Sequence, residues 1–262
     1  MLESFRIGFR DLSEGVRLRR VWVALAQEDI GDQHKRSTLG PLWLLINYFV
    51  FIAIFLFLFQ RGASIPYYAS YMALGLWIWF AISEAISHGV ALFVREEGYI
   101  KGTRLPLTVY VMRLVMQAAL RMCYTAVGCA VIILLCGPAL TIAAFASIAG
   151  VLVVFLVMPA TVIIFGFLGA YFPDGQYIVS NLMRVGMFLT PVFWMPDRQS
   201  GIRLAAYQYN PFTYFVEVVR MPIFDGVVPY TAFGVCLTIG LAVWIFALFL
   251  LGRFKRNLVF VL

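Results

Sequence analysis

The sequence predicts an all-α integral membrane protein with six transmembrane helices, an N-terminal interfacial amphipathic helix, and re-entrant helices between spans five and six. Composition is the first observation behind this class. Hydrophobic residues make up 63% of the 262 residues and charged residues 13%, against about 45–50% and about 25% in soluble domains. The second observation is six apolar stretches of bilayer-crossing length. The third is that Lys and Arg gather on one side of these stretches.

The six predicted spans differ in how clearly they stand out. They cover residues 42–59, 71–94, a stretch that begins gradually after 106 and ends near 136, 142–170, 178–194 and 230–251. Pro159 predicts a kink in the fourth span. The fifth span is the weakest because Asn181, Arg184 and Pro191 interrupt it. Residues 195–229 are too polar and too broken to span, so we expect short re-entrant helices shielded by protein.

We expect a single transmembrane domain over residues 1–262. Residues 1–41 form a cytoplasmic or interfacial segment, residues 42–251 the six-span bundle with its re-entrant region at 195–229, and residues 252–262 a cytoplasmic tail. Within the first segment, apolar residues recur at three- and four-residue spacing among charged ones, which is typical of a helix lying on a membrane surface: Leu18, Val21, Trp22 and Leu25.

Basic residues set the predicted orientation. Thirteen Lys and Arg lie in the segments predicted to be inside, and four lie in those predicted to be outside, which places both ends in the cytoplasm. The net charge of +7 follows from this flanking pattern, so we expect no nucleic-acid partner. The four cysteines all lie inside apolar stretches without metal-ligand spacing, so neither a metal site nor a disulfide is expected.

The chain lacks the motifs of a membrane enzyme. There is no His-Glu-x-x-His zinc motif, no Gly-x-Ser-x-Gly nucleophile turn and no Gly-x-x-x-x-Gly-Lys-Ser/Thr phosphate loop. We therefore expect no catalytic residue, no metal and no cofactor in this chain. A protein of this kind transports rather than catalyses, and any ATP would be hydrolysed by a separate subunit.

Polar residues within the predicted spans are candidate functional residues. Glu84 and His88 lie four residues apart, on one face of the second span. They could form a proton relay, or a structural polar clamp with Arg121 of the next span. Dense aromatic residues offer a second candidate, because sugars stack their C–H faces on aromatic rings. The candidates for lining a glycan channel are Tyr48, Phe49, Phe55, Tyr71, Trp77, Trp79 and Phe80.

Four strings, in order along the chain, resemble ABC type-2 polysaccharide exporter permeases, the membrane subunits that export O-antigen, capsular polysaccharide and teichoic acid. They are HKRSTLGPLW at 34–43, GYIKGTRLPL at 98–107, FLTPVF at 188–193, and NPFTY at 210–214 with Glu217 and Arg220 following. The resemblance covers essentially the whole chain. It implies a homodimer in the bacterial inner membrane, bound to two copies of a cytoplasmic ABC ATPase that holds ATP and magnesium.

The resemblance also implies roles for particular residues. Contacts that couple the ATPase are assigned to the loop after the second span: Arg95, Glu96, Glu97, Tyr99, Lys101 and Arg104. A periplasmic gate is assigned to Asn210, Pro211, Tyr214, Glu217 and Arg220. The substrate is a lipid-linked polysaccharide, whose anionic head group is expected to meet Arg17, Arg19, Arg20, Lys35 and Arg36 near the membrane surface.

Two other functions agree with the same topology. One is an ABC exporter of small molecules such as drugs. The other is a proton-coupled secondary carrier that uses Glu84 and His88, although the sequence lacks the inverted repeat typical of many such carriers.

Overall fold

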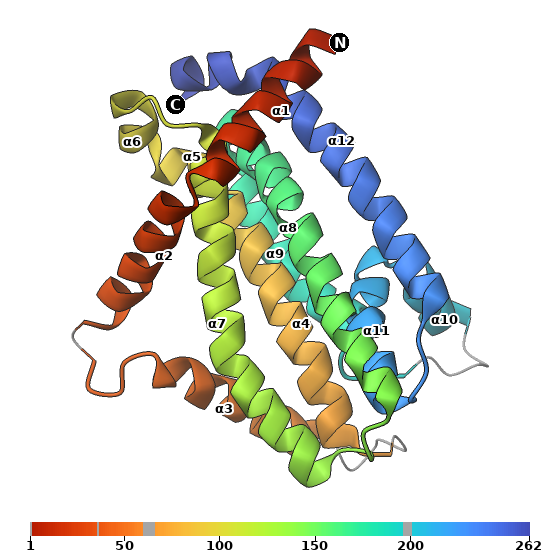
Figure 1. Ribbon diagram of the computed structural model, residues 1–262. Helices are drawn as coiled ribbons and strands as arrows, with labels where there is room; N and C mark the ends of the chain where they lie inside the picture. The colour runs from red at the N-terminus through yellow and green to blue at the C-terminus, as the bar shows by residue number, and fades with distance from the viewer. Residues whose placement is uncertain (1, 36, 60–65, 196–200) are drawn as a thin grey trace.

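The computed structural model describes residues 2–35, 37–59, 66–195 and 201–262, and the regular secondary structure in this part of the chain is all helical (Figure 1). Five helical segments are long and apolar enough to cross a membrane. They are α3 (Leu42–Phe59), α4 (Tyr68–Gly89), α7 (Leu107–Cys136), the segment Ile142–Tyr171 formed by η2 (Ile142–Phe145) and α8 (Ala146–Tyr171), and α12 (Tyr230–Val261). By length and composition, they match five of the six predicted spans.

The predicted fifth span corresponds to α9, which is shorter than expected. It covers Gly175–Leu189, only 15 residues, or about 22 Å at 1.5 Å per residue. The hydrocarbon core of a bilayer is about 30 Å thick. The helix ends early because Pro191 follows, and a residue close before a proline rarely stays helical. A sixth full span thus remains a prediction.

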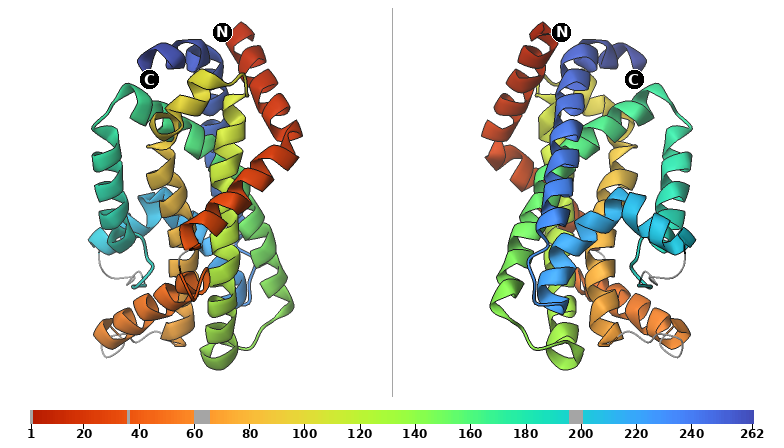
Figure 2. Two further views of the ribbon diagram at one scale, coloured as in Figure 1. Left: turned by 90° about the vertical axis from the view of Figure 1, so that its left-hand side faces the viewer. Right: turned by 90° about the vertical axis from the view of Figure 1, so that its right-hand side faces the viewer.

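Two short helices take the place of a span between α9 and α12. They are α10 (Gly201–Tyr209) and α11 (Pro211–Phe224), and they lie across the middle of the molecule (Figure 2). Asn210 starts α11: its side-chain oxygen accepts a hydrogen bond from the Phe212 backbone N–H at 3.0 Å, and Pro211 occupies the first turn. Broken helices were expected here, while their depth in a bilayer stays a prediction.

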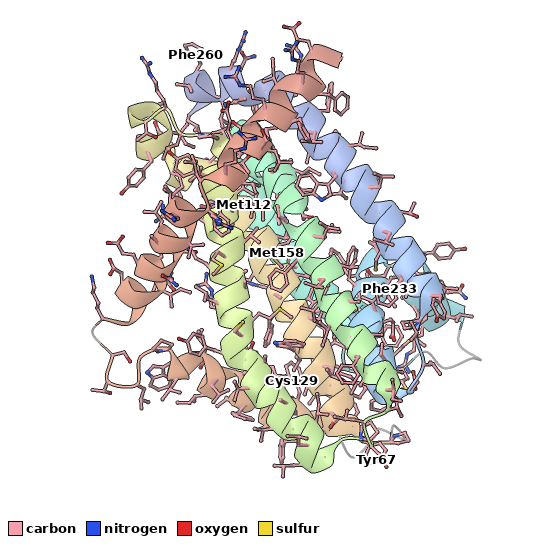
Figure 3. The ribbon with its side chains drawn as sticks, viewed as in Figure 1. Tyr67, Met112, Cys129, Met158, Phe233 and Phe260 are labelled. Atoms are coloured by element: carbon pink, nitrogen blue, oxygen red, sulfur yellow. The ribbon has the colours of Figure 1, made fainter. Side chains whose placement is uncertain are left out.

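The two chain termini lie at the same end of the molecule (Figure 1). This end also carries α1 (Leu2–Arg17), α5 (Leu92–Arg95) and α6 (Glu97–Gly102). Residues labelled in Figure 3 mark the two ends: Phe260 lies beside the termini and Tyr67 at the opposite end. Because both termini lie at one end, the chain passes through the molecule an even number of times. Helices α9 to α11 together therefore make one passage, which brings the chain to the end where α12 begins.

The N-terminal segment forms two helices instead of one. A turn at Leu18 separates α1 from α2 (Arg19–His34). Helix α1 packs against α12 and α7, and α2 packs against α7. Helix α3 then lies across the ends of α4 and α7 opposite the termini (Figures 1 and 2). Many of its large apolar side chains, including Phe51, Ile54 and Phe57, remain exposed.

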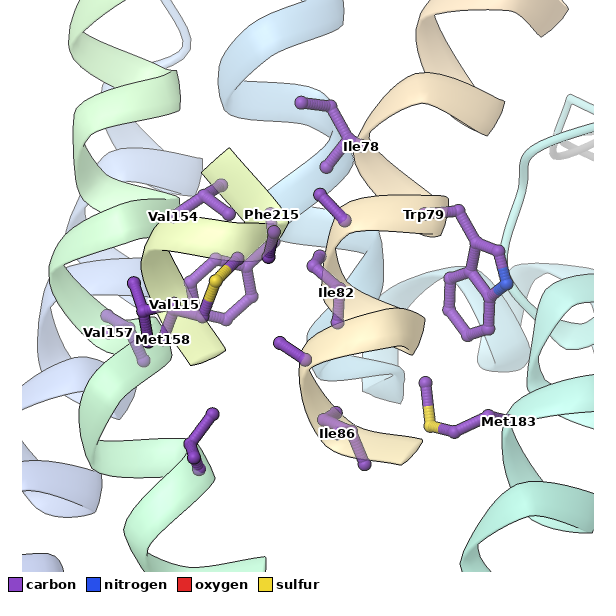
Figure 4. Packing of buried hydrophobic residues seen from close by; sticks show 14 of the residues in the cluster. Ile78, Trp79, Ile82, Ile86, Val115, Val154, Val157, Met158, Met183 and Phe215 are labelled. Carbon is purple, nitrogen blue, oxygen red and sulfur yellow. The ribbon is translucent and has the colours of Figure 1, made fainter. Parts of the chain in front are cut away.

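Helix α4 is the centre of the core and contacts α3, α7, α8, α9 and α11. Its Ile78, Ile82 and Ile86 face Met158 of α8 and Phe215 of α11 (Figure 4). Helices in a membrane associate through close packing, since lipid is as apolar as the side chains. Gly169 illustrates such packing, because a Cβ there would collide with the backbone carbonyl of Val90.

Candidate functional site

A cavity of about 370 Å³ lies between α3, α4 and α7. One part of its lining is aromatic: Tyr48, Phe51, Trp77 and Phe80. The other part is polar: Asn47, Ser83, Glu84, Ser87, His88, Arg121 and Thr125. Ionisable side chains at membrane depth are costly and mark candidate substrate paths when they face a cavity. This cavity is therefore the principal candidate site.

The structure brings Glu84 and Arg121 together across this cavity. Glu84 of α4 forms an ion pair with Arg121 of α7, and both side chains are less than a quarter exposed. Arg121 also donates a hydrogen bond from Nη1 to Gln33 Oε1 of α2 at 3.1 Å. His88 lines the same cavity, yet no hydrogen bond joins it to Glu84 among the described residues. The geometry is that of a clamp between helices rather than a chain of proton carriers.

Three of the seven aromatic candidates line this cavity, namely Tyr48, Trp77 and Phe80. Two of them are held by hydrogen bonds to the backbone. The Tyr48 hydroxyl donates to the Ala73 carbonyl at 2.8 Å, and Trp77 Nε1 donates to the Met122 carbonyl at 3.0 Å. Such anchoring presents rigid ring surfaces to the cavity.

The other four aromatic candidates lie elsewhere. Phe55 stacks on Phe193 with ring centroids 4.2 Å apart, and Trp79 is buried with its ring edge-on to Phe212. Tyr71 belongs to a separate polar cluster described below, and Phe49 is outside the cavity lining. Because α4 is surrounded by helices, residues at different angles on it meet different neighbours, and only one face reaches the cavity.

Helix α6 presents an exposed surface at the end of the molecule that carries the termini. Tyr99 is 61% exposed, and Arg104 after the helix is also exposed. Glu97 and Lys101 form an exposed ion pair at 2.6 Å, and Arg95 is partly exposed beside them. These side chains are free to meet another protein, as a coupling surface requires.

Glu96 differs from its neighbours because it is buried beneath α6. It accepts a hydrogen bond from Arg113 Nη1 of α7 at 3.0 Å. Arg113 also donates two hydrogen bonds of 2.6 Å to Asp29 of α2, which further accepts one from Gln117. Burial alone would raise the pKa of Asp29, but the bonds from Arg113 and Gln117 hold that pKa below its usual value. Glu96 therefore anchors the loop internally.

Asp11 joins both terminal helices to the start of α7. It is 1% exposed and accepts hydrogen bonds from the backbone N–H groups of Leu107 and Thr108, at 3.2 and 3.0 Å, and from the Thr108 hydroxyl at 2.7 Å. It is also ion-paired with Lys255 of α12. The residue before α7 is Pro106, whose side chain cannot accept a hydrogen bond from the first N–H groups of the helix. The Asp11 carboxylate accepts these hydrogen bonds instead.

Comparison with known proteins gives the family. Residues 20–224 match the family model described as ABC-2 type transporter, and this stretch contains every helix of the cavity. The chain belongs to the ABC-2 type transporter family. It is 24% identical over 242 residues to the O-antigen export system permease protein RfbA of Klebsiella pneumoniae, covering 89% of this chain and 91% of that one. It is 25% identical over 201 residues to RfbA of Myxococcus xanthus, covering 71% and 72%.

In this ABC-2 transporter, the residues assigned to a gate form a buried polar cluster. Arg220 is 2% exposed, pairs with Glu217, donates to the Pro191 carbonyl at 2.7 Å and lies 3.8 Å over the Tyr71 ring. Asn210 donates to the Thr190 hydroxyl at 2.9 Å. The cluster thus fastens α11 to the segment after α9 and to α4.

Two strings quoted above, 188–193 and 210–214, meet in this cluster. The remaining two gate candidates lie at its edge: Pro211 is exposed, and the Tyr214 hydroxyl donates to the Gln208 carbonyl at 2.8 Å. These buried contacts hold α11 and the segment after α9 together in this structure.

The basic residues near the N-terminus divide into two groups. Arg17, Arg19 and Arg20 are exposed around the turn between α1 and α2. Lys35 pairs with Asp32 at 2.5 Å, and Arg36 lies outside the described residues. The three arginines form a positive surface at the end of the transporter that carries α6.

Sequence reasoning missed Asp11, Asp29 and Gln117. A signal existed for Gln117, since Arg113, Gln117 and Arg121 follow one another at four-residue spacing and so share one face of α7. A polar stripe on an otherwise apolar helix predicts a polar partner. No comparable pattern singles out Asp11, because α1 carries many charged residues.

Proposed function

We propose that this chain is the membrane-spanning permease subunit of an ATP-driven exporter. Its substrate is a lipid-linked polysaccharide of O-antigen or capsule type, moved from the cytoplasm to the periplasm. The observation that carries the proposal is the likeness to permeases named for O-antigen export, which extends over 89% of this chain and 91% of the relative. A match of this extent covers the whole membrane architecture rather than one motif.

The cavity between α3, α4 and α7 supports a sugar substrate. Aromatic rings offer surfaces for the C–H faces of sugars, and Asn47, Ser83 and Ser87 offer hydrogen-bonding groups for hydroxyls. Transport requires binding that is strong enough to guide and weak enough to release. Shallow stacking on Trp77 and Phe80, which are partly exposed, fits this requirement better than a deep closed pocket.

In the proposed assembly, two copies of the chain bind two copies of a cytoplasmic ABC ATPase, which holds ATP and magnesium. The chain has no phosphate loop of its own, so energy has to come from such a partner. The exposed side chains of α6 and Arg104 are the proposed docking surface, and Glu96 holds that surface on α7 through Arg113.

The positive-inside bias supports a location in the bacterial inner membrane with both termini in the cytoplasm. The end of the molecule that carries α1, α6 and the end of α12 then faces the cytoplasm. The exposed Arg17, Arg19 and Arg20 lie at this end, where the anionic head group of a lipid-linked glycan would first be met.

ATP hydrolysis in proteoliposomes tests the proposal. The chain is reconstituted with its partner ATPase, and the rate is measured with a lipid-pyrophosphate-linked glycan, with the free glycan and with lipid alone. We expect stimulation of several-fold by the lipid-linked glycan only. Stimulation by small amphiphilic drugs instead would favour a drug exporter. Transport driven by a proton gradient without ATP would favour a secondary carrier.

A further inference from the structure

Helix α9 has three distinct faces. One packs inward through Val179, Met183 and Gly186, and Figure 4 shows Met183 facing Trp79 of α4. A second face is exposed and apolar: Ile178, Leu182, Val185 and Leu189. The third is exposed and polar or aromatic, and its residues follow helical spacing of four, three and four: Tyr177, Asn181, Arg184 and Phe188. We refer to these four residues as the α9 stripe.

Arg184 lies at the depth of the middle of α4. Gly186 packs on the Trp79 ring, so closely that a Cβ there would be 3.0 Å from it. Trp79 is near the midpoint of α4, a helix long enough to span a membrane. Arg184 is two residues, about 3 Å along the axis, from Gly186. An arginine at this depth is among the costliest residues in a bilayer, unless it faces water or a counter-charge.

No carboxylate of the chain neutralises Arg184 among the described residues. Glu84 is paired with Arg121, and Glu217 with Arg220. Asp174 precedes the first turn of α9, about 15 Å away along the helix axis. Among the described residues, the chain itself thus supplies no counter-charge to Arg184, and another molecule can supply it.

We propose that the α9 stripe forms a wall of the transport path and that Arg184 binds a phosphate oxyanion there. A guanidinium offers planar paired donors that match phosphate oxygens, Asn181 adds an amide one turn away, and Tyr177 and Phe188 add ring surfaces above and below. This inference rests on the proposed function: the phosphate belongs to the lipid carrier of the substrate. Phospholipid head groups have the same chemistry and are the second source to be distinguished.

Thiol labelling tests the environment of the stripe without measuring transport. In a background in which Cys123, Cys129, Cys136 and Cys236 are replaced by Ala, Arg184→Cys is compared with Val185→Cys, its neighbour on the apolar face. We expect a charged, water-soluble methanethiosulfonate to modify the first variant and spare the second. Equal labelling of both variants, or labelling of neither, would overturn the assignment of the stripe to a water-filled path.

Titration of ATPase activity tests the ligand. For the reconstituted complex, Arg184→Gln should raise the half-maximal concentration of lipid-pyrophosphate-linked glycan about tenfold or more. Arg184→Lys, which keeps the charge but not the paired donors, should give a smaller shift than Arg184→Gln, and Arg253→Gln, at an exposed arginine near the end of α12, should match wild type. The wild-type response is the internal reference: its absence refutes the proposed function, whereas a normal response in Arg184→Gln refutes only the role of Arg184.

A second titration separates the two sources of phosphate. The fraction of anionic phospholipid is varied without the glycan, and basal ATP hydrolysis is recorded for wild type and Arg184→Gln. If basal ATP hydrolysis depends equally on anionic phospholipid in the two proteins, and Arg184→Gln shifts the half-maximal glycan concentration, the oxyanion belongs to the substrate. A dependence that only wild type shows, together with an unshifted glycan response, assigns Arg184 to membrane lipid and overturns its place in the path.

Discussion

Among the described residues, four ion pairs bring together charged side chains inside the protein: three of them join helices distant in the sequence, while Glu217–Arg220 lies within α11. Removing one partner of a buried pair leaves an uncompensated charge, which costs about 3–5 kcal/mol, whereas removing both is often tolerated. The pairs also differ in where they lie: some lie at membrane depth and others lie near the termini. They are Glu84–Arg121, Glu217–Arg220, Asp29–Arg113 and Asp11–Lys255.

The Glu84–Arg121 pair predicts a loss of stability when one partner is neutralised. Glu84→Gln should lower the thermal midpoint in detergent by about 5–10 °C, and adding Arg121→Gln should restore most of it. Ser83→Ala, which alters the same cavity, should leave the midpoint unchanged. Abolished transport in Glu84→Gln with normal stability and ATP turnover would contradict the clamp and favour a proton relay.

Asp11 predicts a similar effect at the end that carries the termini. Asp11→Asn removes the charge that Lys255 and the first N–H groups of α7 share, so the free energy of unfolding should fall by about 2 kcal/mol. Thermal unfolding followed by tryptophan fluorescence measures this change. The control is Glu14→Gln, an exposed position on the same helix. A midpoint equal to that of the control would show that the cap is dispensable.

At the scale of helices, close backbone contact fixes α1 on α12. A Cβ at Gly8 would collide with the Leu248 carbonyl, and one at Gly252 with the Ser4 carbonyl. Glycine permits this approach because it has no side chain to separate the backbones. The contact is made by the terminal parts of both helices, so α1 is held at one end by packing and further along by Asp11.

Gly252→Leu should therefore detach α1 from α12. We expect faster hydrogen exchange in α1, by about tenfold or more, with little change in the middle of α12. Gly31→Ala is the matched control, because nothing lies within 4 Å of a Cβ at that position in α2. Unaltered exchange in α1 of the Gly252→Leu protein would show that α1 is held by other contacts.

Sequence patterns predicted where the helices lie better than they predicted which side of each helix meets which neighbour. Five spans and the broken region at 195–229 followed from hydropathy and from Asn and Pro positions, because bilayer thickness imposes length. The faces of α4 could not be predicted, since a helix contacted on every side shows no alternation of polar and apolar residues. Of the predicted channel residues on these helices, Tyr48 and Trp77 line the cavity, whereas Tyr71 and Trp79 meet other neighbours, and a role of any of them in a channel stays a prediction.

At the scale of the whole molecule, one end gathers α1, α6 and the end of α12 (Figure 1), together with exposed charged residues such as Lys101, Arg104 and Arg253. The proposed docking surface for a cytoplasmic ATPase is small and consists of α6 with its flanking residues. Aromatic residues in such surfaces contribute more to binding than most others. Tyr99 is the exposed aromatic residue of α6.

Tyr99→Ala should weaken binding of the partner ATPase about tenfold or more, while thermal stability stays unchanged. Phe260→Ala is the control, because Phe260 is an aromatic residue 88% exposed at the same end of the molecule. Co-purification and an affinity titration measure the effect. Equal binding by the two variants would place the docking surface away from α6.

The seating of α1 on α12 also has a consequence for biogenesis. Helix α1 is synthesised well before α12, on which it packs. Synthesis at about 5–20 residues per second takes roughly ten seconds to a minute for this chain. Until α12 is made, the amphipathic α1 lacks this binding site, so its docking on α12 is a late event of assembly. A chain stalled before Leu248 would keep α1 accessible to protease, which offers a direct marker that α12 has been made and bound.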